Sequence, residues 1–107
     1  MKRFNESEME MRRFAGTKGH VDVWDAVRGP IVAGVREVAP NSDVPPRPHR
    51  HQEAQLLYVI SGTPTITNGQ ETFGLRPGDF VLLEPNEEHY VVTKDRPAKL
   101  FEVLYGV

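Results

Sequence analysis

Apolar and polar residues alternate along most of the chain in short runs, and turn-forming residues separate these runs. Residues 20–24 alternate with a period of two, apart from Trp24, as a half-buried strand does. A second run, residues 31–38, contains Gly34, which indicates a bulge or a close approach of two backbones. Residues 56–60 are apolar at both parities, so we expect this strand to be buried on both faces.

The second half of the chain continues the same pattern. Further strands are predicted at residues 63–67, 70–75, 80–83, 89–93 and 98–105. Asn68 and Gly69 separate the first two of these, and both accept the positive φ of a type I′ hairpin turn. Roughly eight short strands with almost no helical periodicity predict an all-β fold, either a sandwich or a barrel.

The first 19 residues do not show these short alternating runs. Their only grouped apolar residues are Met9, Met11 and Phe14, and the segment is otherwise strongly polar. We therefore expect an N-terminal arm over residues 1–19, with one helical turn at most, followed by a single domain over residues 20–107. The arm is either a frayed tail or a segment that docks on a neighbouring subunit.

Length, net charge and composition limit the classes of protein to which the chain can belong. The 107 residues suffice for one domain, and the net charge of −2 offers no basic surplus for nucleic acid. No apolar run approaches the roughly 20 residues that span a bilayer, and the charged start does not resemble a secretory signal. There is no cysteine, so any metal must be held by nitrogen and oxygen, and the cytoplasm is the expected compartment.

Three of the four histidines lie at the ends of predicted strands. His49 and His51 are two residues apart, so in an extended segment both imidazoles point the same way, and Gln55 shares their parity. The prolines that precede them keep this segment extended and stiff. His89 follows a loop opened by Pro85. Three imidazoles and an oxygen suit a first-row divalent ion with open coordination positions.

These residues resemble the two motifs of the cupins. In the first motif His49-x-His51 is followed after three residues by Gln55, and after six more by Gly62. The second motif is similar to Pro77-Gly78-Asp79, the apolar strand at 80–83, Pro85 and His89. The resemblance covers about residues 31–104. It implies a double-stranded β-helix, which is a jelly-roll-like cupin barrel, with one metal ion held near one mouth by His49, His51, Gln55 and His89.

The chain departs from the cupin pattern at three positions. Asp43 stands where a glycine usually opens the first motif, with Asn41 nearby as a residue that tolerates left-handed backbone, and Thr93 replaces the asparagine that closes the second motif. Gln55 takes the place of a glutamate. Because its amide is neutral, the metal site keeps one more positive charge, which should polarise a bound oxygen more strongly and should also weaken metal retention. The alternative fourth ligand is Glu53, which shares the parity of both histidines in an unbroken strand.

The sequence favours a mononuclear metal-dependent enzyme that acts on a small oxygenated molecule, of dioxygenase or isomerase/lyase type, with iron, manganese, nickel or zinc. The alternative is a non-catalytic cupin that binds or senses a small ligand, and a metal-free structural barrel is a third interpretation. No catalytic acid or base is assigned, because Tyr58 and Tyr90 are expected to pack away from the metal. Arg47 and Arg50 near the mouth would attract an anion or remain solvated. Because residues 56–60 are apolar on both faces, we also expect a homodimer.

Overall fold

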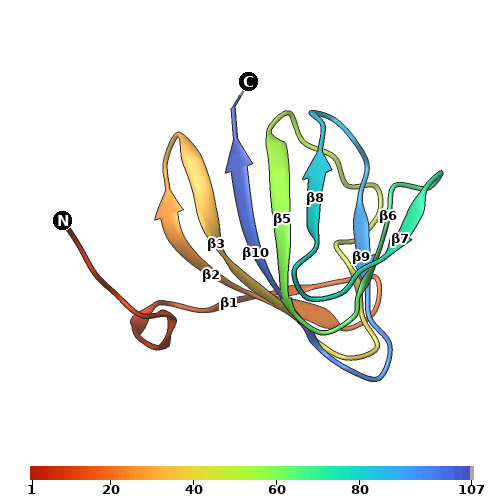
Figure 1. The fold of residues 1–107 in the computed structure, drawn as a ribbon, viewed down its shortest axis with the longest axis horizontal. Coiled ribbons are helices and arrows are strands. Elements are labelled where there is room, and N and C mark those ends of the chain that lie inside the picture. Colours follow the sequence, from red (N-terminus) through yellow and green to blue (C-terminus); the bar gives the residue numbers. More distant parts are fainter. Residues whose placement is uncertain (107) are drawn as a thin grey trace.

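The computed structural model describes residues 1–106 as two antiparallel sheets (Figure 1). A short 3₁₀ helix, η1 (Glu6–Glu8), precedes ten strands: β1 (Arg12–Ala15), β2 (His20–Arg28), β3 (Ile31–Val38), β4 (Asp43–Val44), β5 (Ala54–Ser61), β6 (Thr65–Thr67), β7 (Thr72–Gly74), β8 (Phe80–Leu83), β9 (Tyr90–Val92) and β10 (Ala98–Tyr105). The larger sheet has the order β1-β2-β3-β10-β5-β8, and the smaller has the order β4-β9-β6-β7. The predicted all-β class is confirmed. Within the described residues, no helix is long and apolar enough to cross a membrane.

Two strands were not predicted from the sequence. β1 lies within the segment that we expected to be an arm, and it pairs with β2 at the edge of the larger sheet. The carboxylate of Glu6 in η1 also accepts hydrogen bonds from Lys99 Nζ at 2.9 and 3.0 Å. The start of the chain is therefore bound to its own domain. β4 has only two residues, too few to show an alternation.

The hairpin at Asn68-Gly69 forms, but the predicted type I′ turn is wrong. β6 and β7 are joined by the four residues 68–71, and of the two central residues of the predicted turn only Gly69 has a positive φ, at 94°. The Asn68 side-chain oxygen instead accepts hydrogen bonds from the backbone N–H groups of Gln70 and Glu71. This side-chain contact stabilises a longer loop.

Gly34 allows β2 and β3 to approach closely. A Cβ atom at this position would lie 2.0 Å from the carbonyl oxygen of Trp24, so no other residue fits without a shift of the backbone. The register between the two strands also changes between Asp25 and Val27, which is the bulge or irregularity expected here. Asp25, beside this irregularity, lines the interior cavity.

The barrel interior is packed at one end and hollow at the other. On β5, Val59 is completely buried in the core, whereas Gln55 lines a cavity. On the neighbouring β10, Ala98 belongs to the core and Glu102 lines the cavity. The packed core is formed by Val38, Val44, Leu57, Val59, Ile66, Leu75, Leu83, Ala98 and Leu100, and four of these, Val38, Val44, Leu57 and Leu100, also border the cavity. The hydrophobic core thus holds the strands whose other ends carry the site.

The outer face of the larger sheet is apolar and exposed. Phe80 is 66% exposed and Leu82 is 57% exposed, both on β8, and Ile60 on β5 and Phe101 on β10 extend the patch. The ring of Tyr58 packs on that of Phe80, with ring centroids 4.7 Å apart. The outward side of residues 56–60 is therefore only partly covered in the single chain, contrary to the expectation of burial on both faces.

Candidate metal centre

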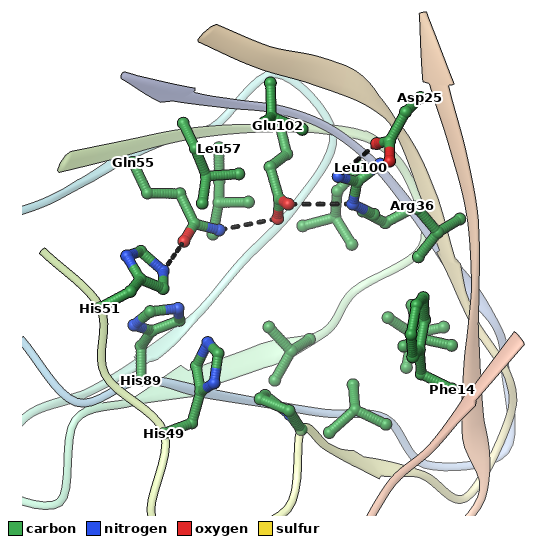
Figure 2. Close-up of a pocket in the computed structure, with 18 of the residues that line it drawn as sticks. Phe14, Asp25, Arg36, His49, His51, Gln55, Leu57, His89, Leu100 and Glu102 are labelled. Atoms are coloured by element: carbon green, nitrogen blue, oxygen red, sulfur yellow. Dashed lines mark hydrogen bonds and ion pairs between the residues drawn. The ribbon is translucent and has the colours of Figure 1, made fainter. Parts of the chain in front are cut away.

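The fold brings His49, His51 and His89 together at the open end of the barrel (Figure 2). His49 and His51 lie in the loop between β4 and β5, and His89 directly precedes β9. Ligand atoms of the three rings all lie within 4.8 Å of one another. The ring centroids are 4.7 to 5.2 Å apart, and each pair of rings is nearly perpendicular. Three imidazoles thus surround one point from three directions.

A backbone hydrogen bond joins the two loops that carry the histidines. The N–H of Asn86 donates to the carbonyl oxygen of His51 at 2.7 Å. Asn86 itself has a left-handed backbone, with φ of 62°, which asparagine tolerates better than most residues. The loop after Pro85 is therefore held by a backbone hydrogen bond to the segment of His51, and this bond helps to set the separation between His51 and His89.

Two further hydrogen bonds determine which ring nitrogens face the centre. Nδ1 of His51 lies 2.9 Å from the carbonyl oxygen of Glu53, and Nδ1 of His89 lies 2.9 Å from that of Glu87. A carbonyl oxygen only accepts, so each Nδ1 carries the proton and each Nε2 keeps a lone pair. This is the usual arrangement around a metal-ligating histidine, in which the second ring nitrogen is held by an acceptor.

Gln55 lies beside the three histidines and is 4% exposed. Its Nε2 donates to Glu102 Oε1 at 2.7 Å, so its Oε1 faces His51 Nε2 at 2.9 Å. Two lone pairs therefore face each other unless a cation joins them, either a proton on His51 or a metal ion. Two ligand atoms at right angles, each about 2.1 Å from an ion, are about 3 Å apart, so this pair fits a shared metal.

The Glu53 side chain lies on the opposite side of His51. Its Oε2 is 3.7 Å from Nδ1 of that ring, and the side chain is about half exposed. β5 begins only at Ala54, so residues 49–53 do not form the unbroken strand on which the alternative ligand depended. In this geometry Gln55, and not Glu53, faces the convergence of the imidazoles.

A row of charged side chains continues from Gln55 across the inner face of the larger sheet (Figure 2). The carboxylate of Glu102 accepts a hydrogen bond from Arg36 Nε at 2.9 Å, and Arg36 Nη2 lies 2.7 Å from Asp25 Oδ1. Asp25 Oδ2 then accepts from Arg12 Nη2 at 2.6 Å. Burial raises the pKa of Glu102, and the positive charge of Arg36 opposes that effect.

These charged residues were not predicted from the sequence to belong to the site. For two of them the sequence pattern did indicate an inward position. Arg36 and Glu102 have the same parity on their strands as the buried residues Val38 and Leu100. A charged residue at an apolar parity of a strand indicates either a buried ion pair or a binding site. Arg12 had no such signal, since its strand was not predicted.

The cavity beside the histidines has a volume of about 580 Å³. The row of charged side chains forms one part of its wall, and most other lining residues are aliphatic: Ala15, Val21, Val23, Val32, Val38, Val44, Leu57, Val91, Leu100 and Leu104, with Phe14, Pro45 and Pro46. This volume is in the range of sites for small organic molecules. The cavity accommodates a ligand that is apolar over most of its surface.

The other sequence candidates lie outside the cavity lining. Tyr58 belongs to the outer face, and the Tyr90 hydroxyl donates to Glu88 at 2.6 Å while its ring stacks under Arg47. Arg47 is paired with Asp43, and Arg50 is paired with Glu88. Both arginines are thus engaged in ion pairs near the mouth.

Burial favours the neutral form of two of the clustered histidines, His49 and His89. It lowers the pKa of His89 to about 4, and it lowers the pKa of His49 as well, with a smaller contribution from the nearby His51. A neutral imidazole is the form that binds metal, so His49 and His89 can bind without first losing a proton.

The chain matches the family model described as "Cupin domain" over residues 34–104. It belongs to the cupin family. The resemblance found in the two sequence motifs is thereby confirmed, and the two sheets are those of the cupin double-stranded β-helix.

Solved structures support the same fold. The chain is similar to a predicted oxalate decarboxylase from Thermotoga maritima, with a TM-score of 0.87 and 16% identity over 99% of this chain and 100% of that one. It is similar to the polyketide cyclase RemF from Streptomyces resistomycificus, with a TM-score of 0.81 and 24% identity over 97% of this chain and 78% of that one. A cupin-2 domain from Rhodospirillum rubrum gives a TM-score of 0.82 and 14% identity over 99% of this chain and 75% of that one. No curated protein matches the chain.

The low pKa of His89 predicts a loss of stability in mild acid. Its pKa is about 4 in the folded protein against 6.5 for the unperturbed group, so protons bind preferentially to the unfolded chain. This stability is present above pH 6.5 and is lost progressively as the pH falls towards 4. Between pH 7 and pH 5 the free energy of unfolding of metal-free protein should fall by about 2 kcal/mol through His89 alone. Urea denaturation at both pH values measures the change.

The His89→Gln variant should lose this part of the pH dependence, and the His20→Gln variant should retain it, because His20 lies outside the cavity lining. An equal fall in wild type and His89→Gln would show that His89 is not the group responsible.

Proposed function

We propose that this cupin is a mononuclear metal-dependent enzyme that acts on a small oxygenated molecule. The observation that carries the proposal is the convergence of acceptor atoms: the Nε2 atoms of His51 and His89 and the Oε1 atom of Gln55, with the ring of His49 beside them. Iron, manganese, nickel and zinc are all compatible with three imidazoles and one oxygen. When bound, such an ion supplies Lewis acidity for an isomerase or lyase, or an oxygen-binding centre for a dioxygenase.

The residues of this chain would position the substrate. One end of the cavity presents the three imidazoles, and its aliphatic wall excludes water from the body of a bound molecule. Arg36, the buried arginine of the wall, is already paired with Asp25 and Glu102. Arg12 and the more exposed Arg28, which also line the cavity, both lie within ion-pair distance of Asp25, so the lining offers no buried, unpaired arginine to a small dianion. The similar folds include, by name, a predicted oxalate decarboxylase and a polyketide cyclase. This cavity favours a molecule larger and less polar than oxalate.

The pairing of those charges also favours a second candidate function, a cupin that binds or senses a small ligand without transforming it. Asp25, Arg36 and Glu102 are each engaged by neighbouring side chains, so none is an evident free acid or base. In that case the metal and the cavity would serve recognition alone.

Metal analysis tests the first part of the proposal. Protein purified without chelator should carry about one transition-metal ion per chain, and His51→Ala should bind it at least 10-fold more weakly, because one ligand is lost. His20→Ala is the matched control and should retain the metal. Wild-type protein without metal, together with no change in His51→Ala, would contradict the proposal.

Metal-loaded protein then separates the candidate functions. It should be mixed with a panel of small phenolic and polyketide-like molecules while oxygen uptake and product formation are followed. Oxygen consumption indicates a dioxygenase, and turnover without oxygen indicates an isomerase or lyase. Saturable binding without turnover would favour the sensing function.

We also propose that a second copy of the chain covers the outer face of the larger sheet. The exposed apolar side chains of Ile60, Phe80, Leu82 and Phe101 lie on three adjacent strands, β8, β5 and β10, where the sheet face can pair with its equivalent in a second copy. Light scattering should give the mass of a dimer for the wild type.

Leu82→Asp should shift the protein to monomer, because it places a charge within the apolar patch. Phe73→Asp changes a residue of similar exposure on the smaller sheet and should leave the dimer intact. A wild-type monomer at high concentration would contradict the proposal.

A further inference from the structure

The amide of Gln55 has two possible orientations, and only one of them presents an oxygen to the histidines. An amide has one accepting and one donating end, and rotation by half a turn exchanges them. At 4% exposure, Gln55 has little water to satisfy a misplaced group. Its neighbours must therefore decide which end faces the metal centre.

Glu102 is the neighbour that determines the orientation of the Gln55 amide. When ionised, its carboxylate only accepts hydrogen bonds, and one oxygen lies 2.7 Å from Gln55 Nε2. In the reversed orientation the amide oxygen would face a carboxylate oxygen in a buried setting, which is strongly unfavourable. The amide NH₂ consequently turns towards β10, and Oε1 turns towards His51.

The remaining members of the row hold Glu102 in place. Arg36 donates to its second oxygen at 2.9 Å, and the Arg36 side chain is only 11% exposed. Asp25 lies 2.7 Å from the same guanidinium, and Arg12 binds Asp25 in turn. Five adjacent strands, β5, β10, β3, β2 and β1, contribute one side chain each to this row.

We propose that Glu102 is a positioning residue that fixes the Gln55 amide with its oxygen towards the metal centre, and that Gln55 and Glu102 form a matched pair. This inference rests on the proposed metal-binding function. It explains why an amide stands where cupins usually have a glutamate. A carboxylate at residue 55 would meet that of Glu102 at hydrogen-bond distance, so the negative charge is placed one strand farther from the imidazoles.

A charge exchange between the two positions tests the pair. Glu102→Gln removes the acceptor-only neighbour and should raise the metal dissociation constant by about 10- to 100-fold, the range found when partners of ligating groups are removed. Gln55→Glu brings two carboxylates together and should lower the melting temperature of metal-free protein by several degrees. In the double variant Gln55→Glu/Glu102→Gln, the new amide at 102 donates to the carboxylate at 55 and accepts from Arg36.

The double variant should therefore recover the melting temperature lost in Gln55→Glu, and it should bind metal at least as tightly as wild type. Glu71→Gln is the matched control, since Glu71 is exposed in the β6–β7 loop, and it should change neither quantity. Metal affinity is measured by competition with a chelating dye, and stability is measured on metal-free protein.

Two results would overturn the inference. One is a strictly additive effect of Gln55→Glu and Glu102→Gln on the melting temperature, and the other is wild-type metal affinity in Glu102→Gln. If wild-type protein binds no metal, the proposed function fails, yet the melting temperatures of the four metal-free proteins still decide whether Gln55 and Glu102 act as a pair.

Discussion

The carbonyl oxygens of Glu53 and Glu87 hold the Nδ1 protons of His51 and His89, and the chemistry of the barrel depends on these two hydrogen bonds. Each bond fixes a tautomer, so that the opposite nitrogen presents a lone pair to the same point. Both accepting carbonyls lie two residues from the histidine that they hold, so the loops themselves create the arrangement. The backbone hydrogen bond between Asn86 and His51 then brings the two loops into one rigid unit.

The larger sheet supports this centre in two ways. Its packed end, around Val59 and Ala98, supplies the hydrophobic burial that stabilises the strands. Its open end uses the same strands to display a row of alternating carboxylates and guanidinium groups. Burying several charges is costly unless each has a close partner of opposite sign. Here Arg36 lies between Glu102 and Asp25 and forms an ion pair with each of them. The cavity can thus carry polar groups without losing the stability of the barrel.

Much of this arrangement could be predicted from the sequence. The strands at 31–38, 80–83 and 98–105 were predicted residue for residue, because period-two alternation and flanking turn residues reflect local chemistry. The clustering of three histidines followed from the motif spacing. The same spacing favoured Gln55 over Glu53 as the fourth ligand. The start of β5 at Ala54, on which the placement of both side chains depends, could not be predicted in this way, because it is set by pairing with β10 and β8. Arg12 and Asp25 were missed for a similar reason: a short edge strand and a shifted register near Gly34 arise from contacts between distant segments.

Long-range ¹H–¹⁵N NMR of the histidine rings, recorded before and after addition of zinc, tests the convergence most directly. Zinc should shift the Nε2 resonances of His51 and His89 and leave both Nδ1 atoms protonated, because the carbonyls of Glu53 and Glu87 hold those protons. The resonances of His20 should not move. Zinc bound at Nδ1 of either ring, or no shift in any of the three clustered histidines, would contradict a metal centre built on these two hydrogen bonds.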